Sequence, residues 1–206
     1  MIKYIVFDLG SVVIKENWDA INDEFMKKYG ISTFMRSQYN EEVQDVYDEV
    51  IAGKKEMVEV FKKILEVKER KDLDPQELVE AYQESYGKNK GLNQELIELI
   101  RELRKRYKLA CLTDTIPIHY EDHRKRGLLD EFDKPFGSHE IGGKKRDGTP
   151  FDILIEKLGV MPNEIVFIDD GEDNVRVAKS KGINAIQFLN NEQLKEDLKK
   201  LDIKIF

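Results

Sequence analysis

The sequence is poor in the features that mark secreted or membrane proteins. Cysteine occurs once among 206 residues, at Cys111 inside an apolar run, which excludes a disulfide framework and indicates a buried thiol. No run approaches the roughly 18 to 20 uncharged apolar residues that a membrane span requires. The N-terminus has only Lys3 ahead of its first apolar run, too little for a signal peptide. We therefore expect a soluble, cytoplasmic protein with no membrane partner.

The sequence has no excess of positive charge and few histidines. Lys and Arg number 34 against 41 Asp and Glu, giving a net charge of −7, and the three histidines lack the spacing of zinc motifs. This balance opposes the basic surface that nucleic-acid binding requires, so nucleic acid is not an expected partner. Apolar residues make up 40% of the chain, which is long enough for one α/β domain with a small appended unit.

Apolar runs of strand length alternate with helical patterns near the N-terminus and throughout the second half. The expected strands are residues 4–7, 109–112, 165–168 and 185–188, with a further one at 132–136. Helices are expected at 117–126, 150–158 and 174–181, with glycines just after them as stop signals. This order predicts an α/β fold, a Rossmann-like parallel sheet flanked by helices.

Between residues 18 and 86 the pattern is helical throughout. Apolar residues recur at helical spacing along 18–29, 43–51 and 57–65. Asp74 and Pro75 then read as an N-cap and first helical residue, opening a helix that Gly87 is expected to end. We expect an inserted small helical bundle: residues 1–14 and 91–206 form the core, and 15–90 form a cap over it.

Polar residues stand immediately after three of the expected strands. Asp8 follows the first, Thr113 and Asp114 follow the second, and Asp169 and Asp170 follow the third. The carboxyl ends of parallel strands meet at one edge of the sheet, so these carboxylates gather where they would repel one another without a cation. Oxygen ligands without histidine or cysteine favour Mg²⁺.

The same segments resemble, in order, the four motifs of the haloacid dehalogenase superfamily. They are FDLGSVV at 7–13, CLTDT at 111–115, SHEIG with KKRD at 138–147, and IVFIDD at 165–170 followed by Asn174, Ala178 and Gly182. The resemblance covers the whole chain, with the helical insertion after the first motif as in the branch with C1-type caps. It implies a Mg²⁺-dependent hydrolase acting on a small phosphorylated metabolite.

The resemblance also implies a role for each matching residue. Asp8 would be the nucleophile that forms an aspartyl-phosphate. Thr113, Asp114 and Lys145 would bind the phosphoryl group, with Lys144 as the rival of Lys145. Asn174 would orient Lys145 or a metal ligand. The expected Mg²⁺ ligands are the side chains of Asp8, Asp169 and Asp170 and the backbone carbonyl of Gly10.

Gly10 departs from the family pattern, which usually has an aspartate here that protonates the leaving oxygen. A positioned acid is worth about 10²- to 10⁴-fold, so its loss matters for alkyl phosphates. Three explanations stay open: a substrate with a good leaving group, an acid from elsewhere, or a non-catalytic binding protein. The candidate acids are His139, Ser11 and Glu16.

Two other hydrolase chemistries are compatible with the missing aspartate. A haloacid dehalogenase uses no metal, so the pair Asp169 and Asp170 argues against it. A phosphonoacetaldehyde hydrolase needs a cap lysine for a Schiff base, and no single cap lysine stands out. The sequence leaves open the substrate and whether the protein is a monomer or a homodimer.

Overall fold

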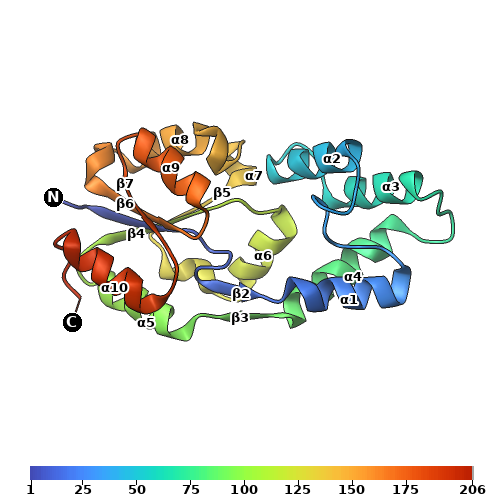
Figure 1. Ribbon diagram of the computed structural model, residues 1–206, viewed down its shortest axis with the longest axis horizontal. Helices are drawn as coiled ribbons and strands as arrows, with labels where there is room; N and C mark the ends of the chain where they lie inside the picture. The colour runs from blue at the N-terminus through green and yellow to red at the C-terminus, as the bar shows by residue number, and fades with distance from the viewer. Residues whose placement is uncertain (206) are drawn as a thin grey trace.

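The computed structural model describes residues 1–205 and has two parts, one built on a sheet and one helical (Figure 1). The strands are β1 (Tyr4–Phe7), β2 (Ile14–Glu16), β3 (Lys90–Leu92), β4 (Lys108–Thr113), β5 (Lys134–Gly137), β6 (Ile165–Asp169) and β7 (Asn184–Gln187). The α-helices are α1 (Trp18–Tyr29), α2 (Glu41–Ile51), α3 (Met57–Val67), α4 (Pro75–Lys88), α5 (Gln94–Leu103), α6 (Pro117–Lys125), α7 (Ser138–Ile141), α8 (Thr149–Leu158), α9 (Glu172–Ser180) and α10 (Asn191–Lys200). Short 3₁₀ turns are η1 (Leu128–Glu131), η2 (Lys145–Asp147) and η3 (Pro162–Glu164).

The main sheet has the order β5-β4-β1-β6-β7, and all its pairs are parallel. The predicted α/β class is therefore confirmed. In the register of the sheet, Phe7 of β1 lies between Cys111 of β4 and Ile168 of β6. The residues that follow these three positions consequently reach the same edge of the sheet.

Helices cover both faces of the sheet because the strands are apolar on both sides. Along β1, Ile5 and Phe7 belong to one apolar cluster, which includes residues of α5 and α10, while Val6 belongs to a second with residues of α8 and α9. Figure 1 shows these helix pairs on opposite sides of the sheet. All three side chains have no exposed surface, so the central strand is fixed from both faces.

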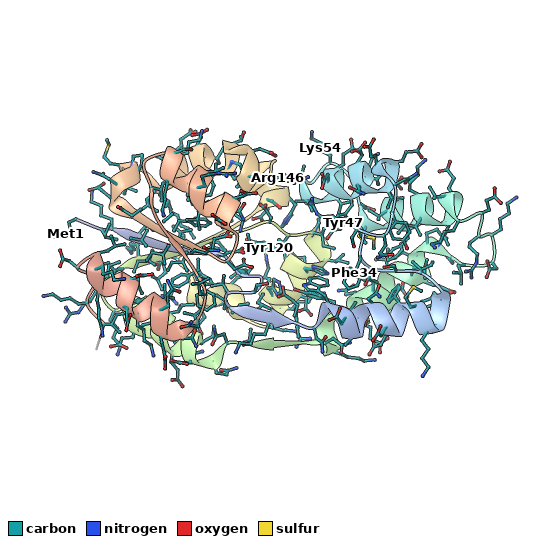
Figure 2. The ribbon with its side chains drawn as sticks, viewed as in Figure 1. Met1, Phe34, Tyr47, Lys54, Tyr120 and Arg146 are labelled. Atoms are coloured by element: carbon teal, nitrogen blue, oxygen red, sulfur yellow. The ribbon has the colours of Figure 1, made fainter. Side chains whose placement is uncertain are left out.

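Helices α1 to α4 form the second part and share their own apolar cluster. Side chains of Asn17, Asn40 and Asp74 accept backbone N–H groups at the starts of α1, α2 and α4, as N-caps do. Figure 2 shows Tyr47 of the helical part and Arg146 of the sheet part near the boundary between the two. No helix among residues 1–205 is long and apolar enough to cross a bilayer.

The two crossings between the parts form a small antiparallel sheet that the sequence did not predict. Strand β2 pairs with β3, with Glu16 opposite Lys90. Both strands have only three residues, too few for a periodic apolar pattern to emerge. The predicted division at residues 15 and 91 falls inside this sheet, so the cap boundaries stay a prediction.

Other differences from the prediction are small. The strand expected at 132–136 is β5 at Lys134–Gly137, because Phe132 ends the turn η1. The helix expected to end at Gly87 continues to Lys88, and Asn89 caps it. Helix α9 begins at Glu172, two residues earlier than expected, which places two acidic residues in its first turn, where the helix dipole favours them.

Buried His119 on α6 provides a test of the packing between α6 and the helical part. Its ring stacks on Tyr86 with centroids 3.6 Å apart, and its Nε2 has no hydrogen-bond partner among the described residues. Burial holds the pKa of His119 well below its usual 6.5, so the folded state favours the neutral ring. Stability is thus fully present above pH 6.5 and is lost as the pH falls, by about 1.4 kcal/mol per pH unit for one histidine.

We expect His119→Phe to unfold at a lower pH than the wild type. Phenylalanine keeps the stacked ring but cannot take up a proton. Urea unfolding between pH 8 and 5, followed by circular dichroism, measures the slope of stability against pH. The two proteins should agree closely at pH 8, and identical slopes below pH 6.5 would contradict the assignment.

Candidate active site

Three carboxylates meet at the carboxyl edge of the main sheet. Asp8 directly follows β1, Asp169 ends β6, and Asp170 begins the loop before α9. The backbone N–H of Asp8 donates to the carbonyl of Ile168 at 2.8 Å. This hydrogen bond holds the end of β1 beside the end of β6. One oxygen from each carboxylate lies within 4.8 Å of the others. The structure therefore brings together the three acids that the sequence singled out.

Lys145 lies between two of these acids. Its Nζ is 2.9 Å from Asp8 Oδ1 and 2.5 Å from Asp169 Oδ2, and its side chain is almost fully buried. Lys144 turns the other way and pairs with Asp48 on α2. Of the two rival lysines, the structure therefore places Lys145 at the acidic cluster.

Backbone and amide groups hold the surrounding residues in place. Asp169 Oδ1 accepts from Asn174 Nδ2 at 3.0 Å and from the backbone N–H of Gly171 at 2.8 Å. Asp114 accepts the backbone N–H of Lys145, at 3.1 and 3.2 Å to its two oxygens. Asn174 is thus bound to a candidate metal ligand, and Asp114 is bound to the turn that carries the lysine.

Burial sets the protonation of the cluster. It raises the pKa of Asp8 to about 7, an effect that the neighbouring charge of Asp169 adds to and that of Lys145 opposes. Burial would lower the pKa of Lys145, but the charges of Asp8 and Asp169 outweigh it and raise that pKa, so the amine stays protonated. Burial and Asp169 also raise the pKa of Asp170. One ammonium group faces three carboxyl groups here, so the site favours additional positive charge.

The residues fit a hard divalent cation. Asp8 Oδ1 is buried and makes no hydrogen bond among the described residues, because its contact with Lys145 has the distance but not the angles of one. Asp169 is fully buried, while Asp170 is exposed. Carboxylate oxygens of this number leave coordination positions for water and a phosphate oxygen, as Mg²⁺ prefers. The predicted contribution of the Gly10 carbonyl stays a prediction.

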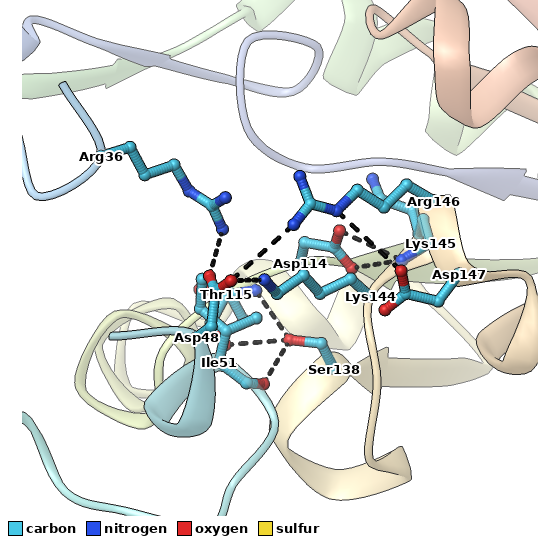
Figure 3. A network of polar contacts seen from close by, with 10 residues as sticks. All are labelled: Arg36, Asp48, Ile51, Asp114, Thr115, Ser138, Lys144, Lys145, Arg146 and Asp147. Atoms are coloured by element: carbon cyan, nitrogen blue, oxygen red, sulfur yellow. Dashed lines mark hydrogen bonds and ion pairs between the residues drawn. The ribbon is translucent and has the colours of Figure 1, made fainter. Parts of the chain in front are cut away.

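The helical part closes against this edge through a polar network (Figure 3). Asp48 on α2 pairs with Lys144, lies 3.7 Å from Arg146 Nη2, and accepts from Arg36 Nη2 at 2.8 Å. Ser138, at the start of α7, donates to the carbonyl of Ile51 at 2.9 Å. Residues of the helical part therefore contact the segment that carries Lys145.

Asp48→Asn should weaken this closure without touching the acidic cluster. Two of the ion pairs of Asp48, with Lys144 and Arg146, cross the boundary. Such pairs contribute about 0.2–1 kcal/mol each, so losing both should raise KM about two- to thirtyfold. We expect kcat to change less than about twofold, because no group bound to the reacting atoms is removed. Glu49→Gln is the matched control, since Glu49 pairs with Lys55 at 2.6 Å within the helical part. An unchanged KM, measured by steady-state kinetics at low salt, would contradict this role of Asp48.

The three candidate acids have different surroundings. Glu16 lies beside the loop that follows Asp8, and its Oε2 accepts the backbone N–H of Ser11 at 3.1 Å. The Ser11 side chain is exposed. His139 on α7 packs its ring against Tyr120, with centroids 4.8 Å apart.

Thr113, the remaining predicted residue, is buried at the end of β4.

Sequence reasoning missed Asp48, Arg36 and Ser138. Asp48 and Ser138 contact residues across the boundary between the two parts, and Arg36 pairs with Asp48 within the helical part. The partners across the boundary are distant in sequence: 96 residues separate Asp48 from Lys144. Asp48 is a half-buried acidic residue on a helix that carries several other acidic residues. No local signal distinguishes it from its neighbours.

Comparison with known proteins gives the family of the chain. The family model of haloacid dehalogenase-like hydrolases matches residues 2–182. The D-ribitol-5-phosphate phosphatase of Bacteroides thetaiotaomicron is 26% identical over 205 residues, covering 96% of this chain and 97% of the relative.

Two solved structures share the fold. A predicted haloacid dehalogenase-like hydrolase from Porphyromonas gingivalis is 24% identical, with a TM-score of 0.79 and complete coverage of both chains. A haloacid dehalogenase family enzyme from B. thetaiotaomicron, in complex with magnesium and inorganic phosphate, is 23% identical, with a TM-score of 0.73 over 91% of this chain and 94% of that one. Because the family model matches most of the sequence, the chain belongs to the haloacid dehalogenase-like hydrolases.

Proposed function

We propose that the protein is a Mg²⁺-dependent phosphatase that hydrolyses a small phosphorylated metabolite through an aspartyl-phosphate at Asp8. The observation that carries the proposal is the cluster of Asp8, Asp169 and Asp170 around the ammonium of Lys145. A buried nucleophile flanked by positive charge suits attack on an anionic phosphate. Relatives named as phosphatases support the same chemistry.

Each residue has a defined part in the proposed reaction. The Asp8 carboxylate attacks phosphorus, the bond to the leaving oxygen breaks, and water then hydrolyses the aspartyl-phosphate. Lys145 neutralises charge on the nucleophile and the phosphoryl group, while the Thr113 hydroxyl donates to a phosphoryl oxygen. Asp114 fixes the turn of Lys145, and Asn174 fixes Asp169.

The proposed metal site consists of the side chains of Asp8, Asp169 and Asp170 and the carbonyl of Gly10. When bound, Mg²⁺ would neutralise enough charge for the anionic nucleophile to approach the anionic substrate. Residues 15–90 would act as a cap that excludes water and contacts the part of the substrate beyond its phosphate. The contacts of Asp48 and Ile51 across the boundary support this role.

The substrate class is proposed from the relatives. One acts on D-ribitol 5-phosphate, and a Thermotoga maritima relative is named as a phosphorylated carbohydrates phosphatase. Sugar and polyol phosphates are alkyl esters whose leaving alkoxides are strongly basic. We therefore place them first in a panel of small phosphate esters.

A phosphate-release screen over this panel, with Mg²⁺ or with EDTA, tests the proposal. We expect turnover that needs Mg²⁺ and is greatest for sugar or polyol phosphates. Turnover of aryl phosphates alone would indicate a substrate with a good leaving group. Absence of turnover throughout, with tight binding of a protein or small molecule, would favour the binding protein considered from the sequence.

A further inference from the structure

We infer that Glu16 is the general acid and base of the reaction, replacing an acid that residue 10 cannot supply because it is glycine. This inference rests on the proposed phosphatase function and adds a catalytic residue to it. Cleavage of an alkyl phosphate needs a proton at the leaving oxygen, and a positioned donor is worth about 10²- to 10⁴-fold. None of the residues assigned above supplies that proton.

The carboxylate of Glu16 lies next to the space that a side chain at position 10 would enter. A Cβ built on Gly10 would lie 3.3 Å from Glu16 Oε1. No other heavy atom of the described residues comes within 4 Å of it, apart from Gly10 and its chain neighbours. Glu16 therefore brings a carboxyl group to the loop two residues after the nucleophile, although it starts from a different strand.

The backbone holds this carboxyl group in place. Ser11 adopts a φ of 57°, in the left-handed region, and its N–H donates to Glu16 Oε2 at 3.1 Å. The pairing of Glu16 with Lys90 in the β2–β3 sheet fixes the strand that carries it. A non-glycine residue in this region costs energy, so the loop is kept in this shape by its surroundings.

The carboxylates of the metal cluster are already engaged. Asp8 is the nucleophile, and Asp169 is held by Lys145, Asn174 and the N–H of Gly171. Glu16 is half-buried and has no ion-pair partner within 4 Å in the described part of the chain. Glu16 is thus a carboxyl group beside the nucleophile loop that has no ion-pair partner among the described residues and is not one of the proposed metal ligands.

The proposed proton transfers balance over the two steps. As the Asp8 oxygen bonds to phosphorus, the bond from phosphorus to the leaving oxygen breaks, and the Glu16 carboxyl gives its proton to that oxygen, releasing the alcohol. Water then attacks the phosphorus of the aspartyl-phosphate and gives a proton to the Glu16 carboxylate. The bond to Asp8 breaks, releasing inorganic phosphate and restoring both residues.

Glu16→Gln tests the inference because it keeps the shape and a hydrogen-bond acceptor for Ser11 but cannot transfer the proton. With a sugar phosphate, we expect kcat to fall about 10²- to 10³-fold. With p-nitrophenyl phosphate, the first step needs no acid, so the variant should release one equivalent of nitrophenolate at about the wild-type rate and then turn over slowly. Rapid-quench kinetics and thermal unfolding measure both steps and the fold.

A double variant, Gly10→Asp with Glu16→Ala, gives a second test of the inference. The alanine clears the space next to position 10, and an aspartate there restores a carboxyl group. We expect Glu16→Ala to be inactive with the sugar phosphate and the double variant to regain at least about tenfold. Glu98→Gln, an exposed change on α5, is the control and should match the wild type.

The outcomes separate the two claims. A wild-type protein inactive on every ester would overturn the proposed function and this role with it. An active wild type with an unchanged Glu16→Gln variant would overturn the role of Glu16 alone. If Glu16→Gln slows the nitrophenolate burst and sugar phosphate turnover equally, Glu16 is a positioning residue. That result would also overturn its role as the acid and base.

Discussion

Asp8→Asn is expected to abolish turnover, by about 10⁴-fold or more, while the protein stays folded. The amide has nearly the same shape as the carboxylate but cannot attack phosphorus. The substitution also removes one buried negative charge next to Asp169. In EDTA, the thermal midpoint of the variant should therefore equal or exceed that of the wild type. Loss of activity with unchanged or raised stability separates a chemical role from a structural one.

Covalent labelling completes this test. Acid quenching of the wild type during turnover of a ³²P-labelled substrate should leave label on the protein that is stable in acid and released by base, as acyl phosphates are. Asp8→Asn should carry none. Label in the variant, or residual activity within tenfold of the wild type, would place the nucleophile elsewhere.

Lys145→Met has the second large effect, on both activity and stability. The variant leaves the buried carboxylates of Asp8 and Asp169 without their shared cation. Breaking a buried pair in this way costs about 3–5 kcal/mol. Loss of one charged group at the phosphoryl site should lower kcat about 10²- to 10³-fold.

Mg²⁺ should partly reverse the loss of stability in Lys145→Met. Because the cation would bind the same carboxylates, excess Mg²⁺ should raise the thermal midpoint more in the variant than in the wild type. Lys144→Met is the matched control, since Lys144 pairs with Asp48 on α2 and not with the cluster. If both lysine variants behave alike, Lys145 has no special role.

The sheet and its acidic edge were predictable because they depend on local patterns. The apolar runs that became β1, β4 and β6 are bounded by polar residues, and parallel strands bring such residues together whatever the helices do. The resemblance favoured Lys145 over Lys144, but the local sequence gives no physical reason for that choice. It depends on the turn η2, where a one-residue shift would reverse which lysine faces Asp8.

The position of Glu16 was beyond sequence reasoning for a related reason. Its contact with the space at Gly10 comes from the fold of the loop between β1 and β2, where Ser11 has a φ of 57°, and β2 itself pairs with a segment 74 residues away. Three-residue strands carry no detectable periodicity. The sequence could name Glu16 only as one of three candidates, and its place beside Gly10 is the reason that we propose it over Ser11 and His139.

The central place of β1 has a consequence for how the chain folds during synthesis. Its partners are residues 108–111 and 165–168, so β1 stays without a partner strand until about a hundred further residues have been made. The helices between residues 18 and 88 pack largely on one another, so they can pack before the later strands are synthesised. A nascent chain of about a hundred residues is therefore expected to carry a helical bundle while its apolar N-terminal strand remains unpaired, available to chaperones or to aggregation.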